Sequence, residues 1–88
     1  MFQIIYGVNF LKSVKKLSEK TQIKLADLLY ILRDEPFDSR LHTKNLSGQL
    51  FGLLSFRITR DWRVIFQFNG VEIINLLRVA HCKDIYRK

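Results

Sequence analysis

Apolar residues at the start of the chain form one short run and one helical stripe. Residues 2–6 are an apolar run that ends at Gly7, a pattern that predicts a strand. Asn9 can cap a following helix over residues 10–18. Apolar residues recur about once per turn on one side of this helix: Phe10, Val14 and Leu17. A strand followed closely by a helix is therefore predicted here.

Leucine spacing predicts a second and longer helix that opens at Thr21. Four leucines follow the i, i+3, i+4, i+7 pattern: Leu25, Leu28, Leu29 and Leu32. Pro36 ends the helix, because proline lacks a backbone donor and clashes with the preceding turn. Only a few residues separate the two helices, so they are expected to form an antiparallel hairpin.

The second half of the chain is predicted to be a polar loop followed by strands. Residues 36–49 are mostly polar and predict the loop. Three segments rich in β-branched and aromatic residues follow: 50–58, 62–68 and 71–80. Asn69-Gly70 predicts a type I′ hairpin turn, in which both central residues need positive φ. Residues 81–88 are predicted to be a polar tail.

The order strand, helix, helix, strand, strand, strand predicts an α+β fold in a single domain over residues 1–88. The helical hairpin is expected to pack on one face of a small, mainly antiparallel, four-stranded sheet. The other face is expected to stay partly open and to form a basic cleft.

The charge balance favours an anionic partner. The chain has 15 Lys and Arg against 8 Asp and Glu, which gives a net charge of +7. Such a charge suits a phosphate backbone, whose neutralisation releases counterions. It suits an acidic protein equally well, and a charge that serves only solubility is the plain alternative.

Few residues are available for metal or disulfide chemistry. Cys82 is the only cysteine, so no disulfide can form within the chain, and a reducing cytoplasm is the expected compartment. His42 and His81 are the only histidines, so no zinc-ligand spacing exists and no metal or cofactor is predicted. Neither a signal peptide nor a membrane span is expected from the pattern of apolar residues.

The segment over residues 62–68 carries the first candidate functional residue. Side chains alternate along a strand, and the apolar set is expected to face the core: Trp62, Val64, Phe66 and Phe68. Arg63 then points to the open face, where its guanidinium group can hold a phosphate through two parallel hydrogen bonds. The alternative is an ion pair with a nearby carboxylate, such as Asp61 or Glu72.

The C-terminal stretch from Arg78 onward concentrates cations with an imidazole and a phenol. Metal-free RNA cleavage needs a proton acceptor, a proton donor and cations that stabilise the phosphorane. His81 can do acid or base work near neutral pH. Lys83 and Arg87 can stabilise charge, and Tyr86 can stack on a base or donate a proton. The alternatives are a polar cap for the histidine and a core cover for the tyrosine.

Two further groups of basic residues can line the cleft. Arg57 and Arg60 flank the turn before residue 62, and His42 and Lys44 lie in the polar loop. Turn chemistry and solvated charge are the plain alternatives for all four. The candidate RNA-binding set is therefore His42, Lys44, Arg57, Arg60, Arg78 and Arg87.

Three stretches of the sequence resemble the RelE/ParE superfamily of type II toxins. One is Arg57-Ile-Thr-Arg-Asp-Trp-Arg-Val-Ile-Phe-Gln-Phe-Asn-Gly70, which resembles the family's Arg-Val-(Gly)-Asp-Tyr-Arg-Val-Ile-Tyr strand. Another is Leu76-Leu-Arg-Val-Ala-His-Cys-Lys-Asp-Ile-Tyr-Arg87, which resembles its closing Arg-Val-Gly-His-Arg-(Lys/Arg)-Asp-Val-Tyr motif. The third is Asn45-Leu-Ser-Gly48, which is similar to its Leu-x-Gly element. With the order of helices and strands, the resemblance covers essentially the whole chain.

This resemblance implies a small sheet with a helical hairpin on one face and a cognate antitoxin that blocks the basic cleft. For the RelE-like branch it implies entry into the ribosomal A site and metal-free cleavage of mRNA there. Arg63 matches the strand arginine that stabilises the phosphate, and Tyr86 matches the C-terminal aromatic residue that stacks or takes part in catalysis. The Asp61-Trp62 pair resembles the YafQ-type subgroup, in which the position of Arg57 is often a functional histidine.

The sequence departs from the family's pattern at several positions. Cys82 stands where many relatives have arginine and YafQ-like members tend to have histidine. Lys44 falls near another YafQ-type histidine position, and Ser55 lies near where some relatives present a lysine. The general base is therefore unassigned, and His81 or Lys83 can substitute for the missing group.

Three functions follow from these observations. The leading hypothesis is a ribosome-dependent mRNA endoribonuclease that cleaves by 2′-hydroxyl attack, and its catalytic set is Arg63, His81, Lys83 and Tyr86. The alternative is a ParE-like inhibitor of DNA gyrase without catalytic activity, which would not need that set. The third is an inactive relative that binds only an antitoxin or an operator complex.

Overall fold

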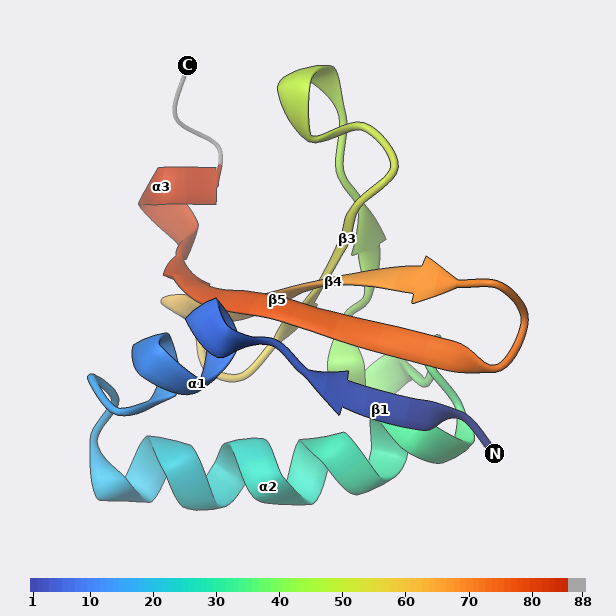
Figure 1. The fold of residues 1–88 in the computed structure, drawn as a ribbon. Helices are drawn as coiled ribbons and strands as arrows, with labels where there is room; N and C mark the ends of the chain where they lie inside the picture. Colours follow the sequence, from blue (N-terminus) through green and yellow to red (C-terminus); the bar gives the residue numbers. More distant parts are fainter. Residues whose placement is uncertain (86–88) are drawn as a thin grey trace.

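Figure 1 shows the computed structural model, which describes residues 1–85 as one sheet flanked by helices. Within this range the strands are β1 Gln3–Tyr6, β2 Lys44–Asn45, β3 Leu54–Arg57, β4 Trp62–Asn69 and β5 Ile73–His81. The helices are α1 Val8–Val14, α2 Glu19–Asp34 and α3 Cys82–Ile85, and short 3-10 turns cover Ser39–Leu41 and Gly48–Leu50. No helix within residues 1–85 is long and apolar enough to span a bilayer.

The strands form one mixed sheet in the order β1-β5-β4-β3-β2. β1 lies parallel to β5, and the other neighbouring strands are antiparallel. The predicted α+β class is confirmed, and so is the mainly antiparallel pairing. The prediction of four strands is wrong, because Lys44 and Asn45 of the predicted loop pair with β3 as a fifth strand.

Helix α2 closely follows the predicted pattern. Its buried residues are Leu25, Leu28 and Leu32. The helix begins at Glu19, two residues before the predicted start, because the Ser18 side chain caps it by accepting the backbone N–H of Thr21 at 3.2 Å. It ends at Asp34, just before Pro36, as predicted.

Helix α1 is shorter than predicted and is fixed by the sheet. It spans Val8–Val14, and Gly7 rather than Asn9 occupies the capping position. The backbone N–H of Val79 in β5 donates to the Ser13 hydroxyl at 2.9 Å. A helix of this length is not stable alone, so its contact with β5 is what maintains it. The predicted helical hairpin is therefore a short helix on β5 beside a long α2 (Figure 1).

The main hydrophobic core lies between these helices and one face of the sheet. Its fully buried side chains include Leu32 of α2, Phe56 of β3 and Phe66 of β4. The predicted alternation along β4 is confirmed, since Val64 and Phe66 are buried and Trp62 and Phe68 pack against the same cluster.

The second face of the sheet, opposite α2, is less open than predicted. A smaller hydrophobic cluster covers its centre: Leu46, Ile65, Ala80 and Ile85. Helix α3 and the connection between β2 and β3 stand on this side of the sheet (Figure 1). Alternation along the strands could not reveal these covers. Leu46 was predicted to lie in a loop and Ile85 in the tail, and residues 50–53 of the connection, predicted as the start of a strand, precede β3, which begins at Leu54.

The β4–β5 hairpin is present, but its turn type differs from the prediction. Asn69 stays within β4 and pairs with Ile73 of β5. Gly70 has a φ of 72°, whereas Asn69 is not among the residues with positive φ. The loop therefore has three residues, 70–72, and only the glycine needs the left-handed conformation.

Gly7→Ala is expected to lower the free energy of unfolding by about 1–3 kcal/mol. A Cβ atom on Gly7 would lie 2.6 Å from the carbonyl oxygen of Leu76 in β5, which accepts the Gly7 N–H at 3.0 Å. The start of α1 would have to move away from β5. Urea unfolding followed by circular dichroism measures the loss, with Val8→Ala at an exposed neighbouring position as the control. A loss below about 0.5 kcal/mol would contradict this close approach.

Candidate nucleic-acid interface

Strand register places four cations on the second face of the sheet. Arg57 of β3 lies directly opposite Arg63 of β4. The next row crosses four strands: Lys44, Ser55, Ile65 and Arg78. Residues that are directly opposite in a sheet project to the same face. We refer to the cations of these two rows as the strand-face cluster: Lys44, Arg57, Arg63 and Arg78.

A β-bulge brings Arg78 into this cluster. Ile65 pairs with Arg78, whereas the next residue, Phe66, pairs with Leu76, so Leu77 has no partner in β4. A bulge of this kind changes which face the following side chains occupy. Strict alternation through β5 from Leu76 would place Arg78 on the helix-covered face. The cationic row therefore depends on a feature that strand periodicity does not show.

Arg57 and Arg63 face each other, and no carboxylate among residues 1–85 neutralises either of them. Within residues 1–85 neither arginine forms an ion pair, so the alternative in which Asp61 or Glu72 neutralises Arg63 does not occur there. Arg63 is partly buried and donates from Nη1 to the carbonyl oxygen of Thr59 at 3.3 Å, which leaves most of its guanidinium fork free. Like charges opposite each other destabilise a sheet. An anion bound between them would remove that cost.

Two buried polar groups on β3 have no hydrogen-bond partner within residues 1–85: the Ser55 hydroxyl and Nε of Arg57. Both residues project to the second face, since they are two positions apart on one strand. Most buried polar groups in folded proteins are paired, so an unpaired one invites an explanation.

His81 lies on the opposite side of the sheet from Arg63. It pairs with Trp62, and the two rings are in edge contact at 5.2 Å between centroids. Its Nδ1 accepts the backbone N–H of Lys83 at 3.2 Å. The imidazole therefore holds the start of α3 and is not directed at a phosphate bound by Arg63.

Helix α3 carries Lys83 directly after the end of β5. The backbone N–H of Cys82 donates to the carbonyl oxygen of Asp61 at 2.7 Å, which ties α3 to the turn before β4. Lys83 is exposed on this short helix. Tyr86 and Arg87, the other candidates from the C-terminal motif, lie outside the described residues.

A basic pocket lies at the edge of the sheet where β3 extends beyond β2. It encloses about 280 Å³. Five basic side chains line it: Lys24, Arg40, His42, Arg57 and Arg60. Three of these were predicted to bind RNA, and Arg57 belongs to the strand-face cluster as well. Lys24 and Arg40 were missed, because Lys24 belongs to the solvent side of a helix and Arg40 to a loop.

Arg40 is held in this pocket by Asp38. The Arg40 Nε and Nη2 atoms donate to the two carboxylate oxygens of Asp38 at 2.9 and 3.0 Å. Asp38 also accepts the backbone N–H of Arg40 at 2.9 Å. Arg40 is thereby largely neutralised, and Lys24, Arg57 and Arg60 form no ion pair within residues 1–85.

The 3-10 turn Ser39–Leu41 is expected to resist acid down to about pH 4 and to loosen below it. Hydrogen bonds from the side chain and backbone of Arg40 lower the pKa of Asp38 from 3.8 to about 2. A carboxyl group with a lowered folded-state pKa stabilises the fold above its unfolded pKa. That contribution is lost as pH falls from 3.8 through about 2. NMR titration of the Arg40 amide measures the midpoint, and a value near 3.8 would contradict the pair.

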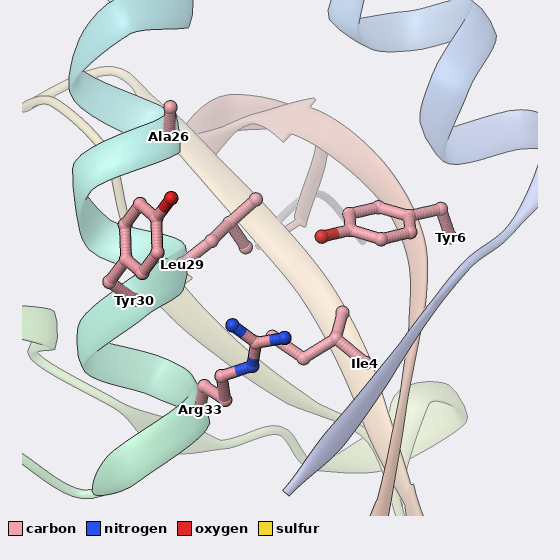
Figure 2. Close-up of a pocket in the computed structure, with 6 residues that line it drawn as sticks. All are labelled: Ile4, Tyr6, Ala26, Leu29, Tyr30 and Arg33. Atoms are coloured by element: carbon pink, nitrogen blue, oxygen red, sulfur yellow. The ribbon is translucent and has the colours of Figure 1, made fainter.

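A second cavity, of about 340 Å³, lies between β1 and α2 and differs in character. Figure 2 shows Tyr6 and Ile4 of β1 across from Leu29 and Tyr30 of α2, with the Arg33 guanidinium group between them. None of the candidate site residues lines this cavity. Residues 1–85 also contain no group of three His, Cys, Asp or Glu side chains that could hold a metal ion.

The fold matches several solved toxin structures. YafQ from E. coli strain BL21(DE3) has a TM-score of 0.77 at 19% identity, covering 98% of this chain and 99% of that one. The YoeB/ParE toxin from Agrobacterium tumefaciens has a TM-score of 0.78 at 17% identity, over 91% and 98%. A chain of the archaeal RelE–RelB complex from Pyrococcus horikoshii OT3 has 0.76 at 21%, over 99% and 98%. The chain has the RelE/ParE toxin fold.

The RelE/ParE resemblance predicted from three motifs is thus confirmed for the fold. No protein-family model matches the sequence, and no curated protein sequence matches it either. At identities of 17–21% these structures establish the common architecture alone. The function of this chain therefore depends on its own residues.

Proposed function

We propose that this chain is the toxin of a type II toxin–antitoxin system and cleaves mRNA on the ribosome. The observation that carries the proposal is the Arg57–Arg63 pair, two guanidinium groups opposite each other on the second face of a RelE/ParE toxin fold. Neither is neutralised by a carboxylate within residues 1–85. Preorganised cations of this kind stabilise the charge that develops on a reacting phosphate.

The proposed reaction is attack by the ribose 2′-hydroxyl on the adjacent phosphorus. The 2′-oxygen bond to phosphorus forms, the bond to the 5′-oxygen breaks, and the products are a 2′,3′-cyclic phosphate and a 5′-hydroxyl. One proton leaves the 2′-hydroxyl and one is delivered to the leaving 5′-oxygen. Arg63 binds the non-bridging oxygens through its free guanidinium donors, and Arg57 adds positive charge from the neighbouring strand.

The C-terminal candidates take different parts in this proposal. Lys83, exposed on α3, supplies charge near the leaving group or accepts a proton. Tyr86 stacks on a base or transfers a proton, as its place in the motif suggests. His81 acts as a positioning residue, because its Nδ1 holds the start of α3 and its ring packs against Trp62. Arg78 and Lys44 extend the cationic surface along the RNA strand.

We also propose a cognate acidic antitoxin as the partner of this chain in the cytoplasm. Three of the structural neighbours come from toxin–antitoxin complexes: RelBE2 from Mycobacterium tuberculosis, RelE–RelB from Pyrococcus horikoshii OT3 and DinJ–YafQ from E. coli. The net charge of +7 suits an acidic protein that competes with RNA for the same cations. Such competition would keep the toxin inactive until the antitoxin is removed.

Primer extension on a reporter mRNA in a purified translation system tests the proposal. Cuts are expected only when ribosomes are present, and they are expected at codons in the A site. A reporter with a single 2′-O-methyl group at the cut position should stay intact, since its 2′-oxygen cannot attack. Intact mRNA throughout, together with inhibition of DNA gyrase in a supercoiling assay, would replace the proposal with the gyrase inhibitor.

A further inference from the structure

The basic pocket at the edge of the sheet gives a second way for this chain to hold RNA. We infer that it binds one backbone phosphate of an RNA strand, at a nucleotide away from the bond that is cut. The inference rests on the proposed function, because it places the remainder of the same RNA. The pocket also extends the proposed RNA-binding surface from the second face, around the edge of β3, to α2.

Charge and chemistry of the pocket support a phosphate. After Asp38 neutralises Arg40, three cations without ion pairs within residues 1–85 still line it: Lys24, Arg57 and Arg60. Lys24 comes from α2, and the other two come from the end of β3 and the turn that follows it, so two distant parts of the chain converge. Cations gathered at this density repel one another unless an anion lies between them.

Arg57 connects the pocket to the proposed reaction site. It lines the pocket and also lies opposite Arg63 on the strand face. Its buried Nε has no acceptor within residues 1–85. β2 pairs with Leu54 and Ser55, and no strand of the described chain, residues 1–85, pairs with the edge of β3 at Arg57. Arg57 is therefore shared by the strand-face cluster and the pocket.

One residue that lines the pocket, His42, has a strained backbone conformation. His42 has a φ of 50°, and among residues 1–85 it is the non-glycine residue with a positive φ. The αL conformation costs a residue with a Cβ on the order of 1 kcal/mol or more, and such strain gathers at ligand sites. Here it turns an exposed imidazole onto the rim, beside the cations.

An acidic peptide fits this pocket less well than RNA. Protein partners bind mainly through apolar and aromatic anchors that enter apolar pockets. The apolar lining here is limited to Leu28 and Ile58, which are 7% and 1% exposed and belong to the core. The pocket thus offers cations and a threonine to a ligand and almost no apolar surface, which suits a phosphate.

The test is the salt dependence of binding to a 2′-O-methyl RNA oligonucleotide, which cannot be cleaved, measured by fluorescence anisotropy. The pocket variant is Lys24→Gln with Arg60→Gln, and the matched control is Lys12→Gln with Lys16→Gln at the α1 end of the chain, where both lysines are exposed. The slope of log K against log salt is expected to fall by about 0.7, because the one phosphate of the pocket is no longer neutralised. The fall in slope for the control variant should be less than half as large.

Parallel binding to ribosomes without mRNA identifies the source of the phosphate. A lower slope with the oligonucleotide assigns the pocket to the substrate strand. An unchanged slope there, with weaker binding to ribosomes, assigns it to ribosomal RNA. The inference is overturned when pocket and control variants match in both assays, or when only binding of a polyglutamate peptide weakens. The cleavage assay is independent of all these outcomes, so failure of the pocket and failure of the proposed function can be told apart.

Discussion

Arg63→Ala is expected to reduce the rate of mRNA cleavage by about 10²- to 10³-fold, the usual effect of removing one preorganised charge stabiliser. The guanidinium group makes a single hydrogen bond, to Thr59, and no ion pair within residues 1–85. Its removal is therefore expected to change the stability of the fold little, and it relieves the repulsion between Arg63 and Arg57. Single-turnover cleavage on programmed ribosomes measures the rate, and the melting temperature confirms that the variant is folded.

Two further variants make this result specific to the guanidinium group. Arg63→Lys keeps the charge but lacks the two-pronged geometry, so it should fall between wild type and Arg63→Ala. Arg33→Ala removes an equally charged residue from the cavity between β1 and α2 (Figure 2) and should cleave like wild type. Full activity in Arg63→Ala, or an equal decrease in Arg33→Ala, would contradict the proposal that the strand-face cluster binds the phosphate at the cut bond.

The sequence predicted the main core well because burial on that side follows simple periodicities. Leu25, Leu28 and Leu32 keep to one side of a helix, and Val64 and Phe66 keep to one side of a strand. The apolar side of the helix packs directly on the apolar side of the strand, so the two periodicities are enough to predict which residues are buried. The second face was predicted less well, because Leu46 and Ile85 reach Ile65 from segments without a visible period.

The candidate site depends on register, which a single sequence does not reveal. Arg57 and Arg63 could be predicted as basic residues near a turn, but their direct opposition follows only from the pairing of β3 with β4. Arg78 reaches their face through a bulge, and His81 falls on the other face for the same reason. One residue of offset in β5 therefore decides which of the C-terminal candidates can share a phosphate.

Phe66→Ala is expected to lower the free energy of unfolding by about 3–5 kcal/mol. The side chain is fully buried, and its ring lies 5.9 Å from that of Phe56 and 5.8 Å from that of Phe68. Truncation leaves a cavity at the centre of β4, where rigid strands on both sides cannot move in. Total stability of a domain this size is about 4–13 kcal/mol, so the variant would lose a large part of it.

Chemical denaturation followed by circular dichroism measures this decrease, with Phe51→Ala as the matched control. Phe51 is 86% exposed in the β2–β3 connection, so its truncation should change stability by less than about 0.5 kcal/mol. A decrease below about 1 kcal/mol in Phe66→Ala would mean that neighbouring side chains move in to fill the cavity, so that the core is not rigid around Phe66. Phe66 and the cations of the strand face project to opposite sides of β4. The folded fraction of Phe66→Ala should therefore bind the 2′-O-methyl RNA with the salt dependence of the wild type, because the cations that neutralise phosphates are unchanged.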